Sequence, residues 1–289
     1  MRSEIKYRQG IVSFLDILGF ETILKTEPAQ IVYDLINTFH YNIKKPYEHG
    51  TINEKYGKLC SIHVLSDCIF KTVDMTNYHD DVYAALSLLG ELSFNIVSQG
   101  KLFYQHGKFL RGAITFGKFF SDEGKALLFG PAIARAYTIE SNYAFYPRIY
   151  IDPCVLEVLH NILLPQYPFG KSDGCVTTGT KDDFLTNFYS WITKGDDGIW
   201  FLDYLGNFRL WFPQDENPCL FISRHKSTIE EILNLPNDHL TDSMLLKYLW
   251  LANYHNRTID KWTKYGWAKS LEGFDPEELS VSIPKQWNK

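Results

Sequence analysis

The chain has no long apolar run. No stretch approaches the ~18 uninterrupted apolar residues of a membrane-spanning helix, and the N-terminal residues MRSEIKYRQG contain no signal-peptide core. The cysteines are odd in number, scattered and without CxxC spacing (Cys60, Cys68, Cys154, Cys175 and Cys219). That pattern is typical of reduced thiols. We therefore expect a cytoplasmic protein with no membrane association.

Positive charge is not concentrated in any one segment. The net charge is −5 and there is no Lys/Arg-rich run, so we expect no binding to nucleic acid. Internal repeats, a P-loop, an HExxH motif and a Ser-His-Asp order are absent as well. Four histidines have no metal-ligand spacing and are expected to be structural: His160, His225, His239 and His255.

What the sequence does contain is enough apolar residues for a substantial core, 45% of 289 residues. Up to Pro153, strand and helix patterns alternate. Strands are expected at Ile11–Asp16, Tyr56–Val64, Asp67–Val73, Phe109–Phe116 and Arg148–Ile151. Helices are expected from Pro28 (buried stripe Ile31, Val32, Leu35, Ile36 and Phe39), over Asp80–Ser98 with Gly100 as its stop, and over Gly130–Tyr143. The first six elements match the ferredoxin-like arrangement, an α+β fold with an antiparallel sheet and helices on one face.

After Pro153 the pattern is weaker. We expect loops at Gly170–Thr180 and Thr193–Gly198, a strand at Gly198–Leu205, a capping box at Ser227–Glu230 before a short helix, and a helix at Thr241–Tyr254. Because no polar, Pro-rich or Gly-rich linker divides the chain, residues 1–153 are interpreted as a core. Residues 154–289 are interpreted as a mixed C-terminal extension packed on it.

Two aspartates carry the candidate chemistry. Asp16 closes an apolar strand, and Asp67 lies at the tight turn of the expected hairpin, so the topology brings both carboxylates to one edge of the sheet. Such a pair repels unless a cation neutralises it, and Mg²⁺ prefers carboxylate and phosphate oxygens. The alternative is structural: an Asp at a strand end often caps a helix, and Asp is common in turns.

These residues resemble the class III nucleotidyl cyclases. Phe14–Phe20 (FLDILGF) is similar to the family pattern F-x-D-I-x-G-F, and Val64–Asp67 stands where the family has its second metal aspartate. Leu110–Gly117 and Phe129–Ser141 are similar to the family's next strand and helix. The resemblance covers roughly residues 10–152.

The resemblance implies a two-metal lyase. Two divalent ions (Mg²⁺ or Mn²⁺) would be held by Asp16 and Asp67, with the Ile17 carbonyl as a further ligand. The amides of residues 17–20, including Gly19 and Phe20, would face the phosphates of a nucleoside triphosphate. It also implies a homodimer in which each site is completed by the partner chain.

The sequence departs from the family at two places. The helix motif N-x-x-x-R is replaced by Ala134 and Thr138, so its transition-state arginine is missing. Arg111 and Arg135 are the candidate substitutes; the alternatives are a buried acidic partner for Arg111 and a surface ion pair for Arg135. Where the family reads the purine with Lys or Glu, this chain has His63, which is either a base contact or a strand residue without a ligand.

Because purine signatures are absent and an aromatic C-terminal part follows, the chain looks most like the pyrimidine cyclases of bacterial Pycsar anti-phage systems. Residues 246–256 resemble that group too. This implies cyclisation of UTP, or next CTP, to a 3′,5′-cyclic monophosphate that acts on a separate effector. Uracil and cytosine stay open, because His63 could serve either. The alternatives are a catalytically silent nucleotide-binding regulator, a purine (ATP or GTP) cyclase, and a polymerase-like or GGDEF-type enzyme. For the last, the chain lacks both a G-G-D-E-F run and a basic channel.

Overall fold

The computed structural model describes residues 5–48, 59–77, 83–166, 180–236 and 239–287. Its strands are β1 (Arg8–Ile17), β2 (Cys60–Leu65), β3 (Cys68–Asp74), β4 (Leu110–Asp122), β5 (Leu127–Phe129), β6 (Ile149–Ile151), β7 (Ile192–Lys194) and β8 (Trp200–Leu202). Its helices are α1 (Phe20–Thr26), α2 (Ala29–Glu48), α4 (Tyr83–His106), α5 (Pro131–Tyr143), α6 (Pro153–Val158), α7 (Leu164–Gln166), α8 (Lys181–Trp191), α9 (Pro218–Leu233), α10 (Asp242–Tyr265) and α11 (Pro276–Leu279). In the described ranges, none of the helices has the length and apolar character needed to cross a membrane.

The sheet has the strand order β2-β3-β1-β4-β6-β8-β7, with β5 paired to β4. The first four strands in this order are antiparallel to one another, and β1 lies between β3 and β4. Helix α2 connects β1 to β2, and α4 connects β3 to β4. This is the ferredoxin-like arrangement, so the predicted α+β fold class is confirmed.

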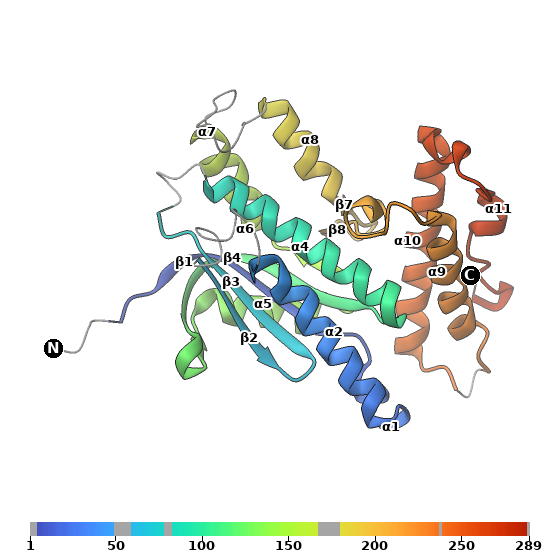
Figure 1. The fold of residues 1–289 in the computed structure, drawn as a ribbon, viewed down its shortest axis with the longest axis horizontal. Coiled ribbons are helices and arrows are strands. Elements are labelled where there is room, and N and C mark those ends of the chain that lie inside the picture. Colours follow the sequence, from blue (N-terminus) through green and yellow to red (C-terminus); the bar gives the residue numbers. More distant parts are fainter. Residues whose placement is uncertain (1–4, 49–58, 78–82, 167–179, 237–238, 288–289) are drawn as a thin grey trace.

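The two faces of the sheet bury different helices (Figure 1). Side chains alternate along a strand, so Ile11 and Leu15 of β1 face α2 and α4, while Val12 and Phe14 face α5. Asp16 has the parity of Phe14 and therefore lies on the α5 face, directly opposite Cys68 of β3 and Arg111 of β4.

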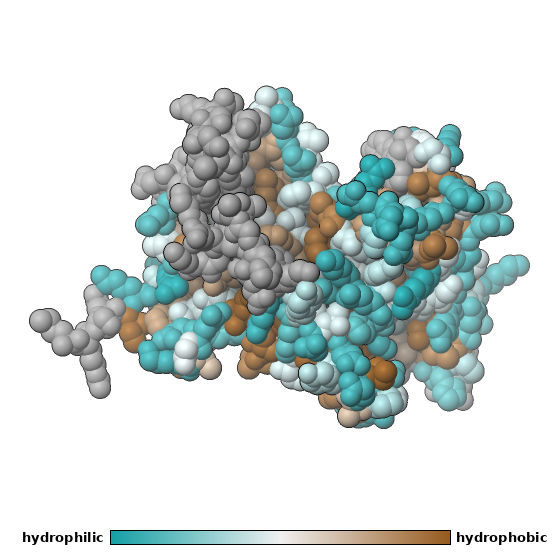
Figure 2. Space-filling model, viewed as in Figure 1, coloured by the Kyte–Doolittle hydropathy of each residue, from teal (hydrophilic) through white to brown (hydrophobic). Residues whose placement is uncertain are grey.

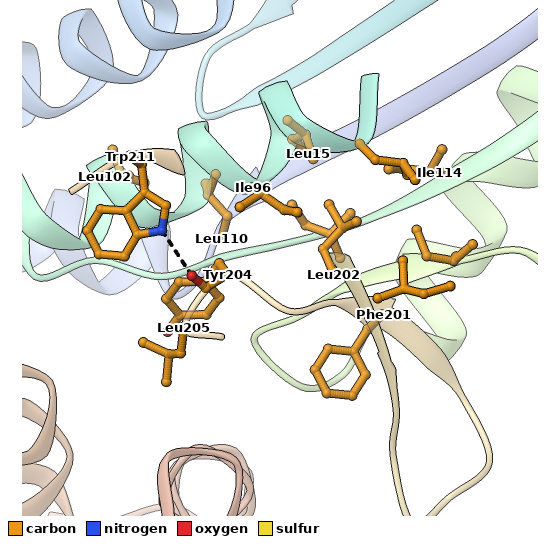
Figure 3. Close-up of a cluster of buried hydrophobic side chains, with 14 of the residues drawn as sticks. Leu15, Ile96, Leu102, Leu110, Ile114, Phe201, Leu202, Tyr204, Leu205 and Trp211 are labelled. Carbon is orange, nitrogen blue, oxygen red and sulfur yellow. Dashed lines mark hydrogen bonds between the residues drawn. The ribbon is translucent and has the colours of Figure 1, made fainter. Parts of the chain in front are cut away.

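Residues after Pro153 continue this sheet. Strand β6, which ends before Pro153, runs parallel to β4; β8 and β7 follow Pro153, with β8 antiparallel to β6 and β7 at the edge. In Figure 3, Leu15 and Ile114 of the first half lie in one cluster with Phe201, Leu202 and Leu205 of the second. The described part of 154–289 therefore shares its apolar core with the ferredoxin-like strands.

Helix α4 continues past the predicted stop at Gly100 and ends at His106. A Cβ on residue 100 would lie only 2.2 Å from the ring of Trp211, so this glycine provides space for the indole. Figure 3 shows that ring donating its N–H to the carbonyl oxygen of Tyr204, at 2.9 Å. Gly100 therefore allows the helix to pack against a residue distant in sequence. From the local sequence alone, such a packing glycine cannot be distinguished from one that ends a helix.

Other predicted boundaries also changed. Strand β4 runs six residues past Phe116 and forms a hairpin with β5. The predicted capping box is wrong, because Ser227 lies inside α9 and its hydroxyl donates to the Ser223 carbonyl. The predicted loop at Thr193–Gly198 begins as β7, the predicted strand at Gly198–Leu205 shortens to β8, and α10 extends to Tyr265. Ile31 is half exposed, although it was assigned to the buried stripe of α2.

Parts of three predicted elements lie outside the described residues: 56–58, 80–82 and 170–179. The face shown in Figure 2 is largely hydrophilic over the C-terminal helices, and its apolar residues form small separate groups.

Candidate active site

Asp16 and Asp67 lie together at one end of the sheet. Asp16 is near the end of β1, and Asp67 is in the β2–β3 turn, where Ser66 takes a left-handed conformation (φ 59°). The Ile17 amide donates to the Asp67 carbonyl oxygen at 3.3 Å and ties the turn to β1. Ligand atoms of Asp16, Asp67 and Cys68 all lie within 4.8 Å of one another. These two carboxylates therefore form a group of the size that can hold a divalent cation.

The surroundings of Asp16 favour its protonated form in the absence of a cation. Burial raises the pKa of Asp16 to about 7; Arg111 opposes this rise, and the nearby Asp67 adds to it. A bound divalent cation supplies the positive charge that this site needs, and binding would displace the proton.

Cys68 is a poor third ligand. Its thiol donates to the Leu65 carbonyl oxygen at 3.1 Å. Burial, together with the nearby charges of Asp67 and Asp16, raises the pKa of Cys68 to about 11, so the thiol is protonated when no cation is bound. The donor set that remains is two carboxylates. Mg²⁺ and Mn²⁺ accept such a set when phosphate oxygens complete the coordination.

Arg111 joins two acidic groups. Its Nε donates to Asp16 Oδ2 at 2.8 Å, and its Nη2 lies 2.8 Å from Glu140 Oε1. Glu140 comes from α5 and is buried, while the Arg111 side chain is partly exposed. The structure therefore pairs Arg111 with two acidic groups, as in one of the two sequence alternatives.

Arg135 is not brought to the two carboxylates. It forms a double hydrogen bond with Asp152, at 3.0 Å from each oxygen, and Thr115 also donates to that carboxylate. Burial would raise the pKa of Asp152, but the Arg135 and Thr115 hydrogen bonds lower it below its usual value. Thr115 lies four residues from Arg111 along β4, a separation of about 13 Å. Within one chain, Arg135 therefore lies apart from the two carboxylates, in an ion pair with Asp152.

His63 lies against the β4–β5 hairpin. Its Nε2 is 2.8 Å from the hydroxyl of Ser121, and its charged neighbours are Glu123 and Asp122. Burial lowers the pKa of His63, so the ring is neutral. These contacts match the alternative of a strand residue without a ligand, and the predicted base contact is not carried further.

The chain turns sharply after β1. Gly19 takes a left-handed conformation (φ 75°) and precedes α1. The amides of Ile17 and Leu18 already donate to Asp67 and Phe109, so of residues 17–20 we retain only those of Gly19 and Phe20 as candidates to face a phosphate. The Phe20 ring is buried in the core, which leaves its backbone as the part available for substrate. The Ile17 carbonyl remains a predicted ligand.

Two residues of this site were not assigned a role from the sequence. Glu140 stands in the matched helix segment, but only the fold reveals its pairing with Arg111. Lys247 of α10 has Arg111 and Asp16 as charged neighbours, and no sequence signal links it to them. A lysine far along the chain, on a helix whose apolar pattern is explained by packing, has no local feature that marks it.

Comparison with known proteins gives structural similarity only. No protein-family model matches the sequence, and a search of curated proteins gave no match. Among solved structures, the chain is similar to the guanylyl cyclase Cya2 (13% identity, 68% of this chain and 93% of that chain, TM-score 0.41). It is also similar to the guanylyl cyclase domain of RhoGC from the aquatic fungus Blastocladiella emersonii (13%, 68% and 95%, 0.41). A third similar structure is a bacterial light-regulated adenylyl cyclase (17%, 54% and 81%, 0.36).

Proposed function

We propose that this protein is a nucleotidyl cyclase that converts a pyrimidine nucleoside triphosphate to its 3′,5′-cyclic monophosphate and pyrophosphate. The observation that carries the proposal is the convergence of the Asp16 and Asp67 carboxylates at the end of a ferredoxin-like sheet. The motif around Asp16 supports the reaction type.

In this reaction the substrate 3′-hydroxyl oxygen bonds to its own α-phosphorus. The bond to the oxygen leading to the β-phosphate breaks, pyrophosphate leaves and the hydroxyl proton goes to solvent. Two divalent cations, when bound, would lower the hydroxyl pKa and neutralise the leaving pyrophosphate. Asp16 and Asp67 would hold those cations. Arg111 orients Asp16 through its hydrogen bond and adds positive charge beside the phosphates.

The pyrimidine preference, with UTP before CTP, and a role in anti-phage signalling through a separate effector rest on the sequence resemblance. The base preference is tested by incubating the purified protein separately with UTP, CTP, ATP and GTP in Mn²⁺ and resolving the products by mass. We expect cyclic UMP or cyclic CMP. A cyclic purine product alone would replace the pyrimidine proposal with the purine alternative.

Substitution of either aspartate tests the site directly. D16N and D67N should each lower turnover by at least about two orders of magnitude while the protein stays folded, because each removes a cation-holding charge. D260N is the matched control, since Asp260 is exposed on α10. Activity that survives in a D16N/D67N double variant contradicts the proposal.

The second candidate is a silent nucleotide-binding regulator. The pairing of Arg111 with Asp16 and Glu140 favours it, because this arginine already has two acidic partners. It predicts triphosphate binding without pyrophosphate release, which the same incubations measure.

A further inference from the structure

Lys247 lies at the candidate site although it belongs to the C-terminal extension. Its ammonium nitrogen is 5.0 Å from the centroid of the Phe145 ring, and its side chain is half-buried. Burial lowers the pKa of Lys247 and the positive charge of Arg111 lowers it further, while Asp16 opposes the shift. Lys247 is therefore near enough to Arg111 and Asp16 for their charges to act on it.

Packing of α10 fixes this position. Tyr248, next to Lys247, contacts the ring of Phe109 edge to face, with centroids 6.1 Å apart. Phe109 is two residues before Arg111, and Leu18 is two residues after Asp16. The Leu18 amide donates to the Phe109 carbonyl at 2.9 Å, and both side chains share a cluster with Leu245 and Leu249 of α10. The helix is thus packed onto the strand ends that carry Asp16 and Arg111.

A second contact holds the same stretch of α10 against the end of α5. Trp250 stacks on Tyr146 with centroids 5.6 Å apart and an interplanar angle of 14°. Tyr146 follows Phe145, the ring beneath the Lys247 ammonium. Lys247 therefore lies between two anchored aromatic contacts.

The two cations differ in what they already bind. Arg111 has two carboxylate partners, Asp16 and Glu140. Within the described ranges, Lys247 has no ion pair, and its ammonium contacts a ring face. A cation–π contact at a partly exposed site is weak, whereas an ammonium–phosphate hydrogen bond is among the strong ones.

We propose that Lys247 binds the terminal phosphates of the triphosphate, so that helix α10 adds a substrate-binding residue to the active site of its own chain. The inference rests on the proposed function. It gives the C-terminal extension a direct part in substrate binding, in addition to its share of the core.

The test compares K247Q with K247R and with K264Q, whose lysine is exposed in the last turn of the same helix. Binding is measured by titration calorimetry in Mn²⁺. The probes are pyrophosphate, the cyclic product and a 3′-deoxy nucleoside triphosphate, which cannot cyclise. The 3′-deoxy probe carries the base of the nucleotide that the wild type turns over; if the wild type turns over no nucleotide, 3′-deoxy-UTP is used. In K247Q, the affinities for the 3′-deoxy triphosphate and for pyrophosphate should fall at least about tenfold. The affinity for the cyclic product should change less than about twofold. K247R should recover part of the loss, and K264Q should match the wild type.

Each other outcome overturns the inference. If the wild type turns over substrate and K247Q binds the triphosphate normally, the role of Lys247 is refuted while the proposed function stands. Equal losses for triphosphate and cyclic product would place Lys247 against the nucleoside or in support of the helix. A wild-type protein that binds no triphosphate removes the proposed function together with this inference.

Discussion

At the scale of single residues, a charged pair lies in the interior between the sheet and α4. Lys71 of β3 and Glu91 of α4 have fully buried side chains and form an ion pair at 2.9 Å. Ser13 donates to Glu91, and Asn95 bonds Lys71, Glu91 and Ser13. Every member has a partner, which is the condition under which buried charge is tolerated.

Loss of one member should therefore cost much more than loss of both. K71M leaves the Glu91 carboxylate without its cation, and we expect a loss of about 3–5 kcal/mol in the free energy of unfolding. K71M/E91L removes both charges and should recover a large part of it. Urea unfolding followed by circular dichroism measures the difference. If the free energy of unfolding of K71M lies within about 1 kcal/mol of the wild-type value, the Lys71 ammonium is not needed to stabilise the buried Glu91 carboxylate.

The residues of the candidate site differ in how visible they are in the sequence. Asp16 and Asp67 could be found because one lies near the end of an apolar strand and the other in a tight turn between two strands, and the strand order brings these two places together. For Arg111 the sequence left two roles open, a phosphate contact or pairing with an acidic group, and the structure identifies Asp16 and Glu140 as its acidic partners. Lys247 could not be found, because its place depends on how Tyr248 packs against Phe109, a contact between side chains far apart in the chain.

At the scale of elements, a line of hydrogen bonds joins α9, α10 and the end of α11. The Tyr204 hydroxyl donates to His225 Nε2 at 2.7 Å, and the His255 Nε2–H donates to the Leu279 carbonyl oxygen at 2.8 Å. Between them, the two Nδ1 atoms are 3.0 Å apart, so one must donate and the other accept. Both rings are therefore neutral, since a further proton would place two N–H groups face to face.

This arrangement predicts that acid destabilises the protein. Burial lowers the pKa of His255 to about 4, and burial and His255 hold the pKa of His225 well below its usual value. The unfolded chain takes up protons on these rings near pH 6.5 while the folded chain does not. The stabilisation is therefore complete above pH 6.5 and is lost as pH falls, by about 1.4 kcal/mol per pH unit for each ring.

Urea unfolding at several pH values between 6.5 and 5 measures that slope. H255Q should reduce the slope by about one proton. A slope that is identical in H255Q and the wild type would show that the pair is not the group that titrates.

Element boundaries were predictable where local signals act alone. Pro131 begins α5, and Thr241 caps α10 by accepting from the Met244 amide. The boundaries failed where a distant contact decides. Gly100 does not stop α4, because it faces Trp211, and β4 extends because β5 returns to pair with it. A sequence window contains neither partner.

At the scale of the whole molecule, the α5 side of the sheet exposes several large apolar residues. They are Tyr7, Leu127, Phe129, Tyr137 and Tyr143. Tyr7 contacts Phe129 edge to face at 6.0 Å, and Phe129 stacks on Phe120 at 4.8 Å, so the hairpin presents an ordered aromatic surface. Exposed aromatic residues grouped on neighbouring elements are typical of a protein interface.

We therefore predict that the protein is a homodimer through the β4–β5 hairpin and α5, and that dimerisation is needed for cyclisation. F129E places a charge on that surface, and a buried unpaired charge opposes association strongly. Sedimentation velocity should show a dimer for the wild type and a monomer for F129E, with a matching loss of turnover. L220E is the control, since Leu220 is similarly apolar and 66% exposed, but on α9. A wild-type protein that is fully active as a monomer would refute the prediction. An F129E dimer would place the interface on another face.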